Sequence, residues 1–142
     1  MKKANLKTFV YLLAILTAGL FIYSFTYMPS PQDNDEWVVP AKYKNMKNPT
    51  DKNDRENLSI GKSLYMKHCK SCHGKTGLGD GPKSDELDTD PGDFSTDLNK
   101  STDGELFYKI KTGKGDMPSF QKKIRDDEDI WLIVNFIRTF KE

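Results

Sequence analysis

Residues 69–73 read Cys-Lys-Ser-Cys-His, and the fold of the whole chain must be built around this short stretch. The chain has two cysteines and two histidines, and all four lie within six consecutive residues, His68 to His73. No distant cysteine is present, so a disulfide framework for the fold is excluded. The spacing Cys-x-x-Cys-His is instead that of a site for covalent haem attachment.

The chemistry of this segment predicts one covalently bound haem c. The thiols of Cys69 and Cys72 would form thioether bonds to the haem vinyl groups, and His73 would reach the iron from the proximal side. Three other interpretations compete with haem. A zinc site needs four ligands in a tetrahedral array, which residues this close together do not comfortably supply. A thioredoxin-like redox pair needs a βαβ unit, and the third alternative is a simple disulfide between the two cysteines.

The sixth ligand of the iron is expected to be Met117. Of the five methionines, Met1, Met28, Met46 and Met66 fall in the N-terminal segment, in the linker and on the first helix. Met117 instead lies between two expected helices, in a loop that continues with a proline. A methionine that only fills the core is the alternative. Ligation by histidine and methionine fills both axial positions and raises the haem potential, which suits electron transfer. His68 is interpreted as a packing or surface residue.

The N-terminal region predicts a membrane anchor. Residues 8–28 carry no charge, and at about 1.5 Å per residue a helix of this length would cross the hydrocarbon core. We therefore expect an anchor or uncleaved signal over residues 1–28, with a cleaved secretory signal as the alternative. Lysines before this segment and acids after it predict a single-pass protein of the cytoplasmic membrane, with a cytoplasmic N-terminus and a periplasmic or otherwise extracytoplasmic haem domain.

A tether is expected to follow the anchor. Residues 29–57 contain four of the seven prolines together with mixed charges, as in an extended linker. Within the tether, the patch at residues 37–40 is expected to pack on the domain or on the membrane surface. The haem domain would then cover residues 58–142.

The haem domain is expected to be all-α, because no strand pattern is convincing. Apolar spacing and helix start signals predict three helices, at about residues 59–70, 102–112 and 126–140. The glycine- and aspartate-rich stretch 74–100 is too long for an ordinary connection in so small a domain. We expect it to wrap the haem, which would complete an otherwise thin hydrophobic core.

These features resemble the small monohaem class I cytochromes c over about residues 58–142. The pattern Gly61-x3-Tyr65-x3-Cys69-x2-Cys72-His73-Gly74 is similar to the first helix and haem site of that family, and Gly77-x-Gly79-Asp80-Gly81-Pro82 is similar to the loop that follows. The last helix, with Trp131 and Phe136, looks like the aromatic C-terminal helix of the family. The resemblance implies three main helices wrapped around one covalent haem, and close contact at Gly61 where the first and last helices cross. It also implies that the carbonyl of Pro82 accepts a hydrogen bond from the free ring nitrogen of His73.

The expected function is one-electron transfer by haem c, cycling between Fe(II) and Fe(III), between membrane-associated redox partners such as respiratory complexes. One alternative is a haem c subunit of a larger respiratory oxidase or dehydrogenase. Another is a monohaem gas sensor or enzyme with an open iron site, which requires that Met117 is not a ligand. No credible nucleophile or acid–base pair is found, so neither an enzyme nor a small-molecule substrate is expected. The net charge of +1 gives no case for nucleic-acid binding.

Overall fold

The computed structural model describes residues 5, 10, 11, 13, 15 and 37–141. The chain divides into two compact units, Met1–Glu36 and Trp37–Glu142. The second unit contains the Cys-Lys-Ser-Cys-His segment and all the helices named below.

The expected transmembrane helix needs correction. Within the residues that the structure describes, no helix is long and apolar enough to cross a membrane. A span needs about 20 consecutive apolar residues in one helix. Of residues 8–28, the structure describes Val10, Tyr11, Leu13 and Ile15, which are helical and exposed, and the remainder of the predicted span lies outside the described residues. The predicted single-pass localisation in the cytoplasmic membrane, with a periplasmic haem domain, is therefore not supported. An uncharged run is a condition for a span, and composition alone does not establish one.

The second unit is helical. Its long helices are α3 (Arg55–His68), α6 (Asp103–Thr112) and α7 (Asp127–Arg138), close to the three predicted ranges. The short elements are α2 (Ala41–Lys44), α4 (Lys70–His73), α5 (Phe94–Asp97) and the 3-10 turns η1 (Ser84–Glu86) and η2 (Leu98–Lys100). Among the described residues there is no strand, so the prediction of a helical fold is confirmed.

Local chemistry explains where the long helices begin. The side chain of Asp54 accepts a hydrogen bond from the backbone N–H of Asn57 (2.9 Å) and caps α3. Thr102 and Glu105 form a reciprocal capping box at the start of α6. Asp126 caps α7, whose first turn carries three further acids that favour the positive end of the helix dipole.

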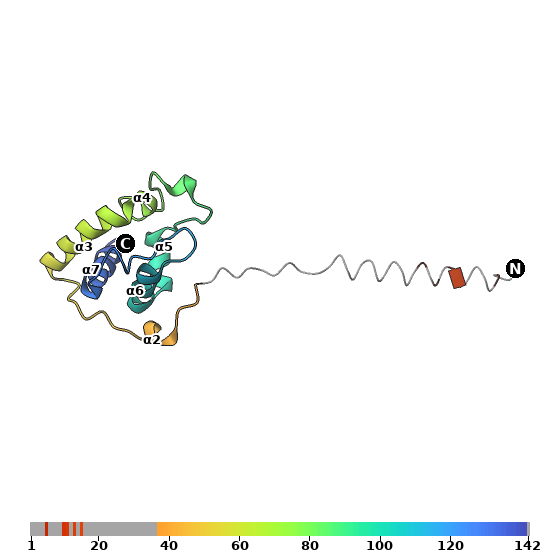
Figure 1. The fold of residues 1–142 in the computed structure, drawn as a ribbon, viewed down its shortest axis with the longest axis horizontal. Coiled ribbons are helices and arrows are strands. Elements are labelled where there is room, and N and C mark those ends of the chain that lie inside the picture. The colour runs from red at the N-terminus through yellow and green to blue at the C-terminus, as the bar shows by residue number, and fades with distance from the viewer. Residues whose placement is uncertain (1–4, 6–9, 12, 14, 16–36, 142) are drawn as a thin grey trace. The chain divides into compact units, whose positions relative to one another are not determined.

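Helix α7 forms the centre of the core. It packs against both α3 and α6, while α2 packs against α6 (Figure 1). At the crossing of α3 and α7, a Cβ on Gly61 would lie 2.7 Å from the carbonyl carbon of Leu132 and 3.2 Å from the Cβ of Phe136. The two backbones can approach this closely only because residue 61 is glycine. The expected close contact at Gly61 is therefore confirmed.

Residues 37–54, which make up much of the range predicted as a tether, lie against α6 and α7. The side-chain amide of Asn48 donates hydrogen bonds to the carbonyl oxygen of Trp131 (3.2 Å) and to Oδ1 of Asn135 (2.7 Å). Asn135 is buried and in turn donates to the hydroxyl of Thr50 (2.8 Å). Apolar contacts on the same side come from Val39, which is buried, and from Tyr43. The division of the chain into anchor, tether and haem domain stays a prediction.

Candidate haem site

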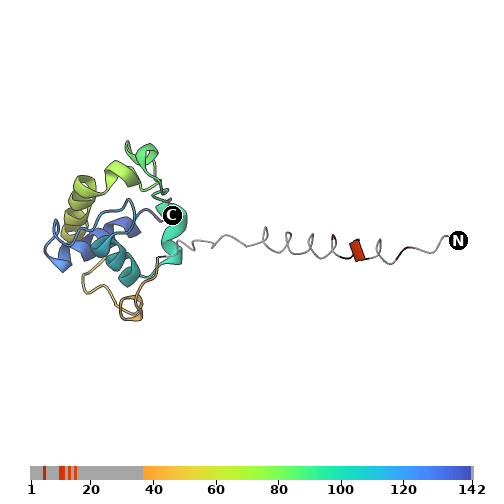
Figure 2. The ribbon, with the colours of Figure 1, turned by 45° about the vertical axis from the view of Figure 1, so that its right-hand side comes forward.

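The Cys-Lys-Ser-Cys-His segment turns sharply at the end of α3. Cys69 is the C-cap residue of α3, and its backbone N–H still bonds to the carbonyl of Tyr65 (2.8 Å). The next turn, α4, is closed by a hydrogen bond from the N–H of His73 to the carbonyl of Cys69 (3.0 Å). Both cysteines and His73 are thus held within a single helical turn beyond α3, with η1 beside it (Figure 2).

Four consecutive carbonyl groups, those of residues 71–74, accept hydrogen bonds from outside the segment. Backbone amides of the following loop supply three of the donors, and a buried phenol supplies the fourth. The pairs are Lys83 N to Ser71 O (2.8 Å), Gly81 N to Cys72 O (3.1 Å), Gly79 N to His73 O (3.0 Å) and Tyr65 Oη to Gly74 O (2.7 Å). The backbone that carries His73 is therefore fixed by α3 on one side and by the loop on the other.

The loop needs glycine where it approaches this backbone. A Cβ on Gly81 would lie 2.6 Å from the carbonyl carbon and oxygen of Cys72, which is closer than real Cβ contacts. Gly77 has a φ of +78°, and its carbonyl accepts a hydrogen bond from the N–H of Phe94 (2.7 Å). These glycines allow the loop to wrap the segment closely and to bring α5 beside it.

The ring of His73 is partly enclosed by aromatic residues. It stacks on Phe94 with centroids 4.7 Å apart and planes inclined by 22°. Its Nδ1 is buried and has no hydrogen-bond partner among the described residues. Burial lowers the pKa of His73, and the nearby backbone of Pro91 acts in the opposite direction. The neutral imidazole favoured by burial is the form that binds a metal.

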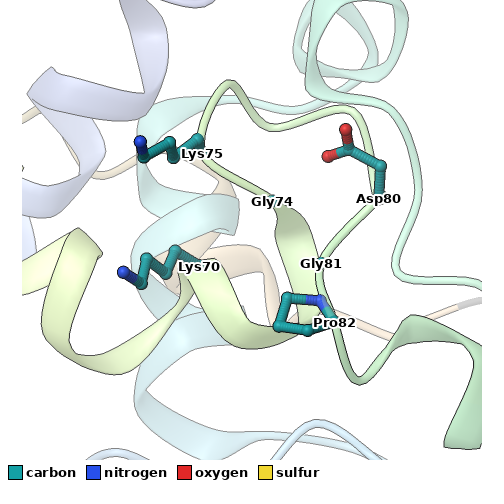
Figure 3. A pocket seen from close by; sticks show the side chains of 6 residues that line it. All are labelled: Lys70, Gly74, Lys75, Asp80, Gly81 and Pro82. Atoms are coloured by element: carbon teal, nitrogen blue, oxygen red, sulfur yellow. The ribbon is translucent and has the colours of Figure 1, made fainter.

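Pro82, expected to orient His73, lies exposed on the outer side of the segment. Pro82 borders an open pocket of about 320 Å³. Lys70 and Lys75 border the same pocket, and their side chains extend away from Pro82 (Figure 3). No hydrogen bond joins Pro82 to His73 among the described residues, and the backbone group that acts on the His73 ring is that of Pro91. The role of Pro82 therefore stays a prediction, and Pro91 is a second candidate for it.

Neither cysteine is in a disulfide. Burial, followed by the influence of Cys72, raises the pKa of the Cys69 thiol to about 12. The sulfur of Cys69 is therefore held as a neutral group against the hydrophobic core. Among the described residues, no group of three or more His, Cys, Asp or Glu is arranged to hold a metal ion.

Met117 ends a tight turn after α6. The backbones of Lys114 and Met117 exchange two hydrogen bonds (2.9 and 3.0 Å) across the turn, and Gly113 and Gly115 have positive φ values of +66° and +55°. The side chain of Met117 is partly buried and packs against the same core as Cys69. Beyond it, the N–H of Phe120 bonds to the carbonyl of Ile110 (3.2 Å) and ties the chain back to α6.

These residues fit haem c. Cys69 and Cys72 lie within one turn, neither is in a disulfide, and the imidazole of His73 has a buried nitrogen without a partner. Buried polar atoms normally have a hydrogen-bond partner, so the unpaired Nδ1 suits an imidazole ring that is part of a haem site. A helical fold wrapped around such a segment defines the class of cytochrome c domains, which carry out haem-based electron transfer.

The comparisons with known proteins identify the family. The model of the family described as "Cytochrome C oxidase, cbb3-type, subunit III" matches residues 56–137, more than half of the chain. The chain belongs to this family, and it binds haem c covalently. No curated protein matches it.

Two solved structures are similar. One is the Kuenenia stuttgartiensis reducing HAO-like protein complex Kustc0457/Kustc0458, with 26% sequence identity, a TM-score of 0.58 and 84% of this chain covered. The similarity covers 54% of that chain, so this protein spans about half of its length. The other is the KustC0563 c-type cytochrome, with 28% identity and a TM-score of 0.51, covering 58% of this chain and 98% of that one.

Several residues around the site were not anticipated from the sequence. They are the phenol of Tyr65 as a donor to Gly74, the stacking partner Phe94, and Pro91. For Tyr65 a signal existed, because it precedes Cys69 by four residues and so shares a helix face with it. For Phe94 and Pro91 there was none, because the path of a long loop is not encoded by local periodicity.

Proposed function

We propose that this protein is a one-electron carrier in which Cys69 and Cys72 hold haem c as thioethers. His73 and Met117 are the proposed axial ligands of the iron. The observation that carries the proposal is the buried, unpaired Nδ1 of His73. It belongs to a segment in which the carbonyls of residues 71–74 are all hydrogen-bonded from outside.

The residues around His73 would position its backbone and its imidazole ring. The hydrogen bonds from the loop and from Tyr65 fix the backbone, and the stack with Phe94 limits rotation of the ring. The bound haem iron supplies the chemistry, which is the gain and loss of one electron between Fe(II) and Fe(III). Rigid ligands favour this chemistry because little needs to reorganise when the charge changes.

Met117 is proposed to close the other axial position. Its turn is braced by paired backbone hydrogen bonds, and its side chain already packs against the core. A ligand held in this way would exclude small molecules from the iron, which suits an electron carrier more than a sensor or an enzyme.

The test is the absorption spectrum of the full chain with haem attached. The oxidised protein should show the weak far-red band of iron–methionine sulfur bonding, and Met117→Ala should abolish it. Met46→Ala is the matched control, because Met46 is exposed and lies far along the chain from the proposed site. A wild-type protein without the band, which binds carbon monoxide readily when reduced, would instead point to an open iron and a gas sensor or enzyme.

A second candidate function is a haem subunit of a larger redox complex. It is favoured by the family, whose description names an oxidase subunit, and by the similar K. stuttgartiensis structure, which is a protein complex. Purification of the tagged full chain under mild conditions separates the two proposals. A single species with the mass of one chain that exchanges electrons with added redox proteins favours the carrier. Stoichiometric recovery with other redox subunits favours the complex.

A further inference from the structure

Asp116, directly before Met117, connects two loops that are far apart in the sequence. Its Oδ2 accepts hydrogen bonds from the backbone N–H groups of Asp88 (2.8 Å) and Thr89 (3.0 Å). One carboxylate oxygen therefore binds two consecutive amides of the loop that follows η1. A Cβ added to the neighbouring Gly115 would lie 4.0 Å from the hydroxyl of Thr89, so the two loops run close to each other here.

The same loop reaches the other proposed axial ligand. Two residues beyond Thr89, the backbone of Pro91 lies near His73 and influences its ring. Phe94, at the end of this stretch, stacks on that ring. The stretch 88–94 thus contacts His73 directly and Met117 through Asp116.

The turn that carries Met117 needs such a brace. It follows Gly113 and contains Gly115, both with positive φ, and glycine permits more backbone movement than any other residue. The Lys114–Met117 backbone pairing closes the turn upon itself, and the side chain of Asp116 bonds the turn to a distant loop. Asp116 is exposed, and its carboxylate bonds to the two backbone amides at the surface.

We propose that Asp116 is a positioning residue that holds the Met117 turn against residues 88–94 and thereby keeps Met117 on the iron. This inference rests on the proposed function, in which Met117 is an axial ligand. Loss of the brace would let the turn open more often, and an added ligand such as imidazole would then displace Met117 more easily.

The experiment compares four full-length proteins with haem attached: wild type, Asp116→Ala, Asp116→Asn and Asp85→Ala. Asp116→Asn removes the same charge but keeps an oxygen that can accept from the two amides. Asp85→Ala removes an acid from the same loop region that is exposed and makes no hydrogen bond or ion pair with the described residues. Imidazole affinity and the far-red band report on Met117, and amide hydrogen exchange of Asp88 and Thr89 reports on the brace without reference to the iron.

In Asp116→Ala we expect imidazole to bind about tenfold more tightly than in wild type, because both hydrogen bonds from the amides of Asp88 and Thr89 are lost. The far-red band should weaken, and exchange at Asp88 and Thr89 should accelerate. Asp116→Asn and Asp85→Ala should stay within about threefold of wild type, because neither loses the brace.

Two results would overturn the proposal, and they are distinguishable. If wild type has the band but Asp116→Ala binds imidazole no better than Asp85→Ala, Met117 is a ligand and Asp116 does not position it. If wild type lacks the band and Met117→Ala behaves like wild type, the ligand assignment itself fails and the inference fails with it.

Discussion

The hydroxyl of Tyr65 donates a 2.7 Å hydrogen bond to the carbonyl oxygen of Gly74, so that α3 holds the residue directly after His73. Tyr65 is fully buried, and its ring also contacts Phe136 and Phe140 at centroid distances of 5.4 and 5.2 Å. The first helix and the C-terminal aromatic residues therefore meet at the backbone of the haem segment.

Tyr65→Phe should lower the free energy of unfolding by about 1–3 kcal/mol, because the carbonyl of Gly74 is left without its buried partner. The measurement is chemical denaturation of the haem-loaded protein, followed by circular dichroism. Tyr108→Phe is the matched control, since the Tyr108 hydroxyl makes no hydrogen bond with the described residues. Equal stability of the two variants would show that the Tyr65 hydrogen bond contributes nothing.

Gly61→Ala should push α3 and α7 apart where they cross and so lower the free energy of unfolding. The added Cβ would lie 2.7 Å from the carbonyl carbon of Leu132, and overpacking of this kind costs about 1–3 kcal/mol. Ser63→Ala, at an exposed position of the same helix, should leave the stability unchanged or slightly raised because alanine favours helix. Urea denaturation of both variants tests this, and a Gly61→Ala protein as stable as Ser63→Ala would contradict the close crossing.

Arg138 connects the end of α7 to the start of α6. Its guanidinium donates to Oδ1 of Asp103 (2.8 Å), to the carbonyl of Leu98 and to the carbonyl of Ser101 (2.7 Å). Arg138→Gln loses most of these bonds and should lower the unfolding free energy by about 2 kcal/mol, which thermal denaturation would detect. Arg125→Gln, at an exposed arginine, controls for the lost charge; equal melting temperatures would exclude a stabilising role for Arg138.

The lowered pKa of His68 predicts a small loss of stability in acid. Burial, followed by the positive charges of Lys67 and Lys123, lowers the pKa of His68 below its ordinary value of 6.5. The folded protein therefore binds the proton less readily than the unfolded chain, and stability falls as the pH drops from above 6.5 through the lowered pKa.

The unfolding free energy of wild type minus that of His68→Gln should accordingly decrease as the pH falls from about 7.5 to about 5. Comparing the two proteins cancels the contribution of His73, which both retain. A pH-independent difference would mean that the surroundings of His68 do not disfavour its charged form.

Much of the helical framework follows from local signals. The predicted helix at 102–112 agrees with α6 because the Thr102 capping box and Gly113 mark both of its ends within the sequence. The predicted start of α3 was about four residues late, because the cap at Asp54 lay within a stretch that composition had assigned to the tether. The transmembrane prediction was not supported, since an apolar run specifies neither a continuous helix nor its surroundings.

The sequence alone determined the class of the protein and its cofactor. Cys69, Cys72 and His73 are adjacent, so their chemistry requires no knowledge of the fold. Only the tertiary structure decided which groups support that segment: Tyr65 at Gly74, Pro91 near His73, and Asp116 on the amides of Asp88 and Thr89. The physical reason is the distance along the chain over which each effect acts. Covalent spacing and helix periodicity act over a few residues, whereas these contacts depend on the path of a long loop whose hydrogen-bond partners are set by how the whole chain packs.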